Sequence, residues 1–281
     1  MKRNQKIKYV SIVLSSIILA MALHIMASNY STTPKVANWS FFVNVLGLQL
    51  TLVVWYFIAF GSIAFIFYMF EDKLPGVKSG KGLRYGISIG ILWLWGMLEG
   101  VSLSGNPLIN EFFTGICDAI PILLMGLLLG IFTTKTNNIE TTKKPFSLKT
   151  IFLPVFIFST IFLVGRYLFY CTNIMKSGYR LSPYFTFVWT FLMGTCIGIT
   201  YLLLGQATKS SSLIISAIKF GIIIFGVNWL VFVIFIPFIF KGTLVDSIVR
   251  ITVDTLLVSL SYYISESLEK RLVRKKQSLK Y

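Results

Sequence analysis

Five ionisable side chains lie inside long apolar stretches of this sequence, where a charge is costly. They are His24, Glu99, Asp118, Arg166 and Asp254. A charged group in hydrocarbon costs several kcal/mol, so such residues usually face a partner, the interior of a helix bundle or water. A buried carboxylate then calls for a cation, a proton or a basic side chain, and an arginine calls for an anion because its guanidinium stays charged. These five residues are therefore the candidates for a binding site.

The composition shows what kind of scaffold must position them. Hydrophobic residues make up 56% of the 281 residues and charged residues only 13%. Soluble domains carry about 25% charged residues, so this chain cannot cover itself with a water-facing surface. We expect an all-α fold, a polytopic bundle of about eight transmembrane helices. Its N-terminal apolar run lacks a clear cleavage site, so we interpret it as a retained span rather than a signal peptide.

The predicted spans are apolar runs of roughly the 20 residues that a membrane crossing needs. Their bounds are Tyr9–Met26, Phe42–Phe70, Tyr85–Leu103, Phe112–Phe132, Ile151–Tyr170, Tyr184–Leu204, Leu213–Phe240 and Ile251–Ile264. The last run is short and is expected to continue as a cytoplasmic helix. On this reading, 20 of the 26 Lys and Arg residues fall on the side of the two chain ends and alternate connections. Positive charge marks the cytoplasmic side, so both termini are predicted to be cytoplasmic, in an inner or cytoplasmic cell membrane.

The net charge of +16 is explained by the same asymmetry. Basic loops orient the chain and meet anionic headgroups, so we expect the lipid bilayer as a partner and no nucleic acid. Three scattered cysteines and one histidine predict no metal site, no cofactor and no disulfide framework. The sequence carries no signal for an oligomeric state.

The two halves of the sequence look related. Three groups of positions match in the same order at an offset of about 133 to 136 residues: Trp55 to Gly61 with Trp189 to Gly194, Arg84 to Ile87 with Lys219 to Ile222, and Asp118 with Asp254. We predict two parallel four-helix repeats, 1–134 and 151–281, joined by a cytoplasmic linker, 135–150, with a short basic tail at the end. Pairs of glycines four residues apart, such as Gly86 with Gly90 and Gly126 with Gly130, predict close helix packing.

A short motif carries a family resemblance. Leu74-Pro75-Gly76 is followed by Lys81-Gly82-Leu83-Arg84-Tyr85-Gly86. This LPG…KGLxYG element resembles uncharacterised bacterial multi-pass inner-membrane proteins. The resemblance covers only the second to fourth spans. It implies a bacterial inner-membrane protein and no particular activity.

Predicted topology places all five ionisable residues toward the outer ends of their spans. We therefore expect an outward-facing pocket between the halves, lined by Asp118 and Asp254, with Glu99, Arg166 and His24 at its mouth. Arg166 is expected to contact a carboxylate, Glu99 or Asp118. In the alternative interpretation the charges form local structural pairs, such as Asp254 with Arg250 across one helical turn.

Three functions remain open on the sequence. The first is a small transporter or membrane binding component for a small or lipid-like, cationic substrate. The second is a non-transporting membrane regulator, immunity factor or complex subunit. The third is an intramembrane enzyme acting on lipid or peptide, for which the repeat-related carboxylates would form a dyad, although the chain contains no HExxH, GxSxG or P-loop motif.

Overall fold

The computed structural model describes residues 3–30, 38–134 and 148–278 of the chain, and the described part is helical. In chain order the helices are α1 (Arg3–Met26), η1 (Ser28–Tyr30), α2 (Phe41–Leu46), α3 (Leu48–Phe70), η2 (Glu71–Lys73), α4 (Lys78–Met97), α5 (Glu99–Ser104), α6 (Leu108–Thr133), α7 (Leu148–Cys171), α8 (Pro183–Leu204), η3 (Gly205–Thr208), α9 (Leu213–Ile218), η4 (Lys219–Gly226), α10 (Val227–Val233), α11 (Phe235–Ile239) and α12 (Leu244–Ser278). The predicted 135–150 linker falls mostly outside the described residues.

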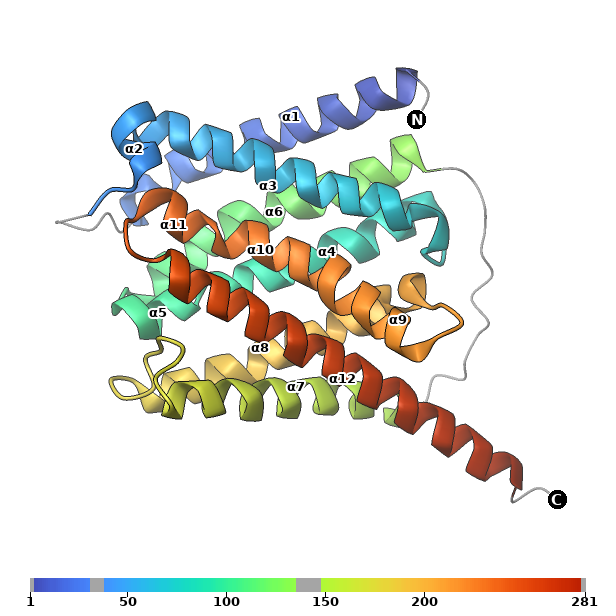
Figure 1. Ribbon diagram of the computed structural model, residues 1–281. Coiled ribbons are helices and arrows are strands. Elements are labelled where there is room, and N and C mark those ends of the chain that lie inside the picture. The colour runs from blue at the N-terminus through green and yellow to red at the C-terminus, as the bar shows by residue number, and fades with distance from the viewer. Residues whose placement is uncertain (1–2, 31–37, 135–147, 279–281) are drawn as a thin grey trace.

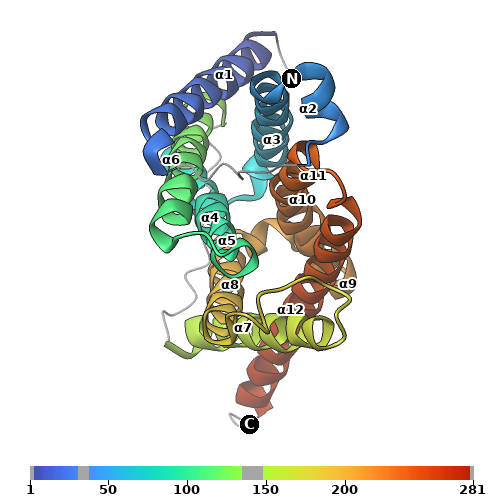
Figure 2. The same ribbon diagram turned by 90° about the vertical axis from the view of Figure 1, so that its left-hand side faces the viewer.

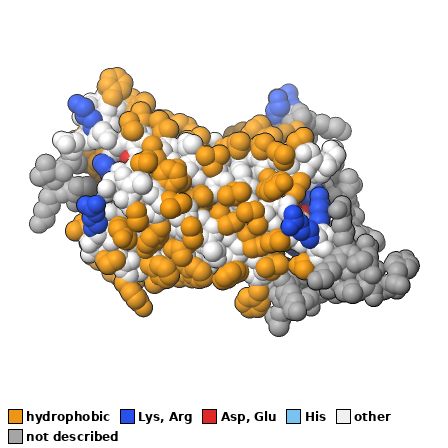
Figure 3. Space-filling model, turned by 60° about the horizontal axis from the view of Figure 1, so that its bottom comes forward, with side chains coloured by type: hydrophobic (Ala, Val, Ile, Leu, Met, Phe, Trp, Pro, Cys, Tyr) orange, Lys and Arg blue, Asp and Glu red, His pale blue; other side chains and the backbone are white. Residues whose placement is uncertain are grey.

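Seven helical segments within the described residues are long and apolar enough to cross a membrane. They are Arg3–Met26, Leu48–Lys73, Lys78–Ser104, Leu108–Thr133, Ile151–Cys171, Pro183–Thr208 and Leu213–Ile239. Apolar side chains cover the middle of the face shown in Figure 3, and Lys and Arg gather toward its two ends. An apolar band between two charged ends is what a bilayer requires. The predicted class, a polytopic helical membrane protein, is confirmed.

The eighth predicted span corresponds to α12, which is not among these seven. Its first half carries Asp246, Arg250 and Asp254, so it is less apolar than the others. α12 nevertheless lies along the full length of the bundle, and its C-terminal end extends past the other helices (Figure 1). The helix begins at Leu244, seven residues before the predicted start of the span, so part of the predicted outer loop is helical. Its continuation beyond Ile264 agrees with the sequence prediction.

Three other predicted spans are interrupted. The third is divided at Leu98, between α4 and α5. The second is divided at Gly47, whose φ of +76° is unfavourable for residues with a side chain and ends α2 before α3 begins. The seventh contains η4, which is a π-helix, and bends again at Ile234 before α11. A π-helical insertion widens a helix and is often found at functional sites.

The long helices form a flattened ring. Each packs on the next in the order α1, α6, α4, α8, α7, α12, α10 and α3, and α3 returns to α1. Figure 2 shows this ring from its end, as two facing rows. Aromatic side chains fill the space between the rows: the rings of Trp55 and Trp93 lie 5.7 Å apart, and Phe232 lies 5.2 Å from Trp93 and 5.0 Å from Trp229.

Glycines bring α4 and α6 into the closest contact of the bundle. A Cβ added to Gly126 would lie 2.7 Å from Gly86 Cα and 2.8 Å from Gly82 O. On α8, Gly194 and Gly198 abut the backbone of α7 in the same manner. The predicted role of these pairs in helix packing is therefore confirmed. The hydrophobic effect does not drive helices together inside a membrane, because lipid tails are as apolar as the side chains. Close backbone contact therefore stabilises such helix pairs through van der Waals packing.

The α4–α6 contact generates the first prediction. Gly126→Ala should lower the free energy of unfolding by about 1–3 kcal/mol, because its Cβ meets backbone that cannot give way. Gly61→Ala is the matched control, since nothing lies within 4 Å of that Cβ and alanine favours the helix. Thermal unfolding of the purified variants measures both. Equal stability of the two would contradict this account of the contact.

Candidate functional site

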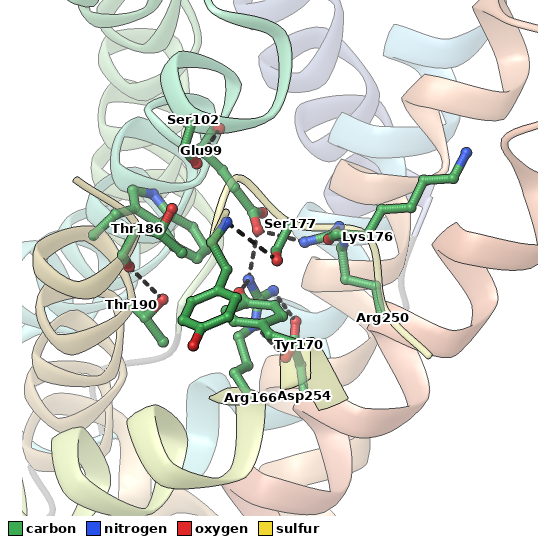
Figure 4. A network of polar contacts seen from close by, with 12 residues as sticks. Glu99, Ser102, Arg166, Tyr170, Lys176, Ser177, Thr186, Thr190, Arg250 and Asp254 are labelled. Atoms are coloured by element: carbon green, nitrogen blue, oxygen red, sulfur yellow. Dashed lines mark hydrogen bonds and ion pairs between the residues drawn. The ribbon is translucent and has the colours of Figure 1, made fainter. Parts of the chain in front are cut away.

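Arg166 and Asp254 form a two-pronged ion pair inside the bundle. Arg166 Nε donates to Asp254 Oδ1 at 2.8 Å, and Nη2 donates to Asp254 Oδ2 at 2.5 Å. Both side chains are 0% exposed. The pair joins neighbouring helices α7 and α12 (Figure 4). Such fork-shaped pairing fixes orientation as well as charge.

Glu99 connects this pair to a second arginine. Its Oε1 accepts from Arg166 Nη1 at 2.6 Å and also from Arg250 Nη1. Glu99 is the first residue of α5, directly after the chain bends at Leu98, and this bend directs its carboxylate toward α7 and α12. An acidic residue is also favourable in the first turn of a helix.

Aromatic groups complete the shell around the charges. Arg166 Nη1 donates to the Tyr170 hydroxyl at 2.9 Å, and Trp229 Nε1 donates to Asp254 Oδ2 at 2.8 Å. The Arg166 guanidinium also lies 5.0 Å from the Phe162 ring centroid and 4.8 Å from that of Trp189. We call this set the Arg166 network: Glu99, Arg166, Tyr170, Trp229, Arg250 and Asp254.

Arg250 extends the network to the connection between α7 and α8. Its Nη2 donates to the backbone oxygen of Lys176 at 2.8 Å and lies 3.3 Å from Asp246 Oδ2. Asp246 in turn accepts from the Lys176 backbone N–H at 2.9 Å. Near this point Gly178 packs against the backbone of Ser102. The network therefore ties α5, α7, α12 and one connection into a single unit.

The charges of the Arg166 network balance. Two buried guanidinium groups face two buried carboxylates, with the less buried Asp246 at the edge. Asp254 lies ten residues after the start of α12, about 15 Å along the helix axis, and its side chain is 0% exposed. At such depth an unpaired charge is costly. Every charge of the network already has a partner within the protein. The network therefore suits a structural role, which is to hold α5, α7 and α12 together, and we call this role a clamp.

The second polar group is more open. His24 Nε2 lies 3.0 Å from Asp118 Oδ1, joining α1 to α6. The Tyr56 hydroxyl lies 3.4 Å from the same oxygen and its ring 6.2 Å from the imidazole. The His24 side chain is 31% exposed, whereas that of Asp118 is 6% exposed. We call these three residues the His24 cluster. Asp118 is the acceptor of this cluster, and its basic partner His24, which is charged only when protonated, can be reached from outside the protein.

The structure thus divides the five predicted residues into two groups. Glu99, Arg166 and Asp254 meet, and His24 meets Asp118. Within the described residues, no hydrogen bond or ion pair joins Asp118 to Asp254, so they do not form the carboxylate dyad considered from the sequence. Two surface cavities lie elsewhere on the described part of the chain. An apolar one lies between α7 and α8 and includes Tyr167 and Phe187, and a polar one lies beside α9 and α12 and includes Lys209 and Glu266. Neither is lined by any of the five residues.

Individual pairings were predicted with mixed success. The contact of Arg166 with Glu99 is confirmed. Asp118, the other expected partner of Arg166, binds His24 instead, since α6 lies beside α1 rather than α7. The alternative pairing of Asp254 with Arg250 is wrong, because Arg250 turns to Glu99 and to Asp246, four residues before it.

Sequence reasoning missed three members of the two groups, Tyr56, Tyr170 and Trp229, and gave Arg250 the wrong partner. Helical spacing could have found Tyr170, which lies four residues after Arg166 and so shares a helix face with it. Trp229 and Tyr56 carry no such signal, because they come from helices that are distant in the sequence.

Among the residues that the structure describes, no group of three His, Cys, Asp or Glu side chains is placed to hold a metal ion. No family model, no curated protein and no solved structure matches this chain. Functional conclusions therefore depend on the geometry of the two groups themselves.

The Arg166 network leads to a double-variant prediction. Arg166→Met should cost about 3–5 kcal/mol of stability, because it leaves Asp254 buried without its cation. Arg166→Met combined with Asp254→Leu should be more stable than Arg166→Met alone, since an apolar pair replaces the ion pair. The exposed Arg180 provides the control Arg180→Met, which should change stability by less than about 0.5 kcal/mol. Unfolding in detergent measures the stability of all three variants, and a double variant less stable than Arg166→Met alone would contradict this account of the pair.

Proposed function

We propose that this chain is a carrier or binding component for small cationic molecules in a cell membrane, with the His24 cluster as its working site. The observation that supports it most directly is that His24, 31% exposed, lies 3.0 Å from the nearly buried Asp118. A carboxylate at this position needs a cation, and here the cation in place is one that can lose its charge and be approached. The topology, the internal symmetry and the chemistry of this pair support the same function.

The proposed topology has eight crossings and both ends in the cytoplasm. It is supported by α12, which lies alongside the seven apolar spans, and by the chain ends: α1 begins and α12 ends at the same end of the bundle (Figure 1). The basic side chains of Lys6, Lys8, Lys209 and Lys270 belong to this end. Positive charge favours the cytoplasmic side. The His24 cluster then lies in the outer half of the membrane.

We also propose that the two halves are parallel repeats. Two matching hydrogen bonds cross between them: Trp55 Nε1 donates to Val231 O at 2.8 Å, and Trp189 Nε1 donates to Trp95 O at 2.8 Å. The donors lie 134 residues apart in the sequence and the acceptors 136 apart. Helix neighbours match too, since α1 packs on α6 as α7 packs on α12. A duplicated unit with an even number of spans would place both halves in the same orientation.

Under this symmetry, the two ion pairs become counterparts. His24 with Asp118 joins α1 to α6, and Arg166 with Asp254 joins α7 to α12. The cations lie 142 residues apart in the sequence and the carboxylates 136 apart. One half therefore keeps a permanent guanidinium, sealed on all sides. The other half has an imidazole, which, unlike a guanidinium, can release its proton and become neutral.

This difference suggests how binding and proton release would be coupled. While His24 is protonated, it neutralises Asp118. Once the proton leaves, Asp118 keeps only hydrogen bonds from neutral groups, and the cationic group of a substrate can replace the imidazolium. Substrate and proton would then compete for one carboxylate, which is the basic requirement of proton-linked exchange.

Trp93 carries an unpaired donor in the core, connected to Tyr56 through the rings of Trp55 and Phe60. It precedes Trp229 by 136 residues, and its buried Nε1 has no hydrogen-bond partner within the described residues. Its counterpart Trp229 donates to Asp254. Trp93 packs against Trp55 and Phe60, the neighbours of Tyr56. An unpaired buried N–H is costly, and a bound ligand or water would satisfy it.

The second candidate function is a non-transporting membrane protein, such as a regulator, an immunity factor or a subunit of a complex. The Arg166 network favours it, because a sealed clamp that ties α5, α7 and α12 restrains the movement that alternating access needs. The two functions differ in whether Asp118 binds a cation from solution.

The topology can be tested with a natural cysteine. Cys171 is exposed at the end of α7, in a connection proposed to face outward. In a Cys117→Ser/Cys196→Ser background, a membrane-impermeant maleimide should label Cys171 in intact cells. Asp72→Cys, made in a background that also lacks Cys171, provides the cytoplasmic control and should react only after lysis. The opposite labelling pattern would invert the orientation.

The cation site can be tested by ligand-dependent thermal stability. Wild-type protein is screened with small amines and quaternary ammonium ions, on both sides of the imidazole pKa. A binder at 100 times its Kd should stabilise the fold by about 2.7 kcal/mol, more strongly at the higher pH because His24 no longer competes. Asp118→Asn should abolish this shift, and the exposed Asp72→Asn should keep it. A shift that survives in Asp118→Asn contradicts the proposed site, and no shift with any ion supports the non-transporting function.

A further inference from the structure

A polar cavity opens at the other end of the bundle from the His24 cluster. It has a volume of about 170 Å³ and is lined by Lys209, Ser210, Leu213, Ser216, Tyr262, Glu266 and Lys270. We call it the Lys209 cavity. Its residues come from the connection after η3, from the start of α9 and from the part of α12 that approaches the end of the bundle, where α12 runs past the other helices (Figure 1). This places it at the boundary between apolar and polar surfaces.

The Lys209 ammonium keeps unused donor capacity in this cavity. Lys209 Nζ lies 3.6 Å from Glu266 Oε1, which already accepts from the Tyr201 hydroxyl at 2.9 Å. This Lys209–Glu266 distance is longer than a hydrogen bond. The Lys209 side chain is 44% exposed, and Lys270 is exposed as well. The negative charges that act on the lining residue Tyr262 come from Glu266 and Glu269. The exposed ammonium groups can therefore still donate to an anion.

Serine side chains fix the shape of the same cavity. The Ser210 backbone N–H donates to Ser216 Oγ at 2.9 Å, and the Ser210 and Ser216 hydroxyls donate to the backbone oxygen of Ser212 at 3.1 and 3.0 Å. These bonds hold the connection that carries Lys209 against the first turn of α9. Because the hydroxyls are already bonded, the lysine ammonium groups are the donors that suit the oxygens of a phosphate group.

Apolar surface begins directly beside these donors. Leu213 lines the cavity, and Ile214 and Ile218, which follow it on α9 four residues apart, are exposed. On α12, which packs on α9, Leu256, Leu260 and Tyr263 are exposed. A ligand with a charged head and a long apolar tail could place one in the cavity and the other along these helices. A free phosphate would use only the first feature.

We propose that the Lys209 cavity binds the phosphate of an anionic phospholipid, with Lys209 and Lys270 as its cations and the acyl chains along the exposed side chains of α9 and α12. Each Lys near a membrane surface contributes about 1 kcal/mol to the attraction of anionic lipid. The proposal needs only the membrane class of the protein and stands apart from the function of the His24 cluster.

The test measures lipid bound to the purified full chain. Delipidated protein is titrated with phosphatidylglycerol, with phosphatidylcholine and with soluble glycerol phosphate, and binding is followed by native mass spectrometry and thermal stability. We expect wild-type protein to bind one phosphatidylglycerol in preference to phosphatidylcholine and to ignore glycerol phosphate. Equal binding of phosphatidylcholine, or equal stabilisation by glycerol phosphate, would overturn the assignment.

Matched variants separate a site from general attraction. Lys209→Gln/Lys270→Gln should weaken phosphatidylglycerol binding by at least about tenfold. Lys6→Gln/Lys8→Gln removes the same charge from exposed positions on α1 at the same end of the bundle and should leave it unchanged. Lys209→Arg/Lys270→Arg keeps both charges and should retain the lipid, which shows that loss in the glutamine variant is not misfolding. Equal losses in the two glutamine variants would show diffuse attraction and refute the cavity.

Discussion

The bundle depends on one constraint, which is that a charge placed in hydrocarbon must be neutralised from within the protein. Arg166 and Asp254 satisfy it together, because the planar guanidinium matches both carboxylate oxygens and leaves a third donor for Glu99. This third bond is what brings α5 into contact with α7 and α12. Arg250 then balances Glu99 and reaches the connection at Lys176. A requirement of electrostatics thereby becomes a requirement on the arrangement of helices.

The rest of the bundle is held by shape rather than by charge. Glycines let α4 and α6 approach to backbone contact, and stacked tryptophans and phenylalanines fill the space between the two rows of the ring. Apolar packing of this kind needs no charged partner, so lipid can lie against the outer side of these helices. The two kinds of contact occupy different helix pairs. The charged clamp holds α7 to α12, while the glycine contact holds α4 to α6, and the aromatic core links the two rows.

The two polar groups differ in a manner that bears on function. In the Arg166 network two buried guanidinium groups face two buried carboxylates, so its role is explained by stability. In the His24 cluster a nearly buried carboxylate has one close basic partner, an imidazole that is 31% exposed and carries a charge only when protonated. A protein that only needed to join α1 to α6 would have no use for this openness. This is why the proposed binding site lies at Asp118 and not at the more heavily charged Asp254.

The sequence by itself determined the class of the protein and the residues under electrostatic stress. Composition required a membrane, apolar runs located most helices, and the cost of buried charge singled out five of the nine members of the two groups. It also predicted that Arg166 would meet Glu99. Only the tertiary structure decided which cation meets which carboxylate, because that depends on the order of helices around the ring, and apolar periodicity contains no information on this order. The same reason explains why Trp229 and Tyr56 were missed. The break at Gly47 depends on its backbone conformation, which hydropathy does not report. The start of α12 at Leu244 was missed because hydropathy does not distinguish a helix with inward-facing charges from a polar loop.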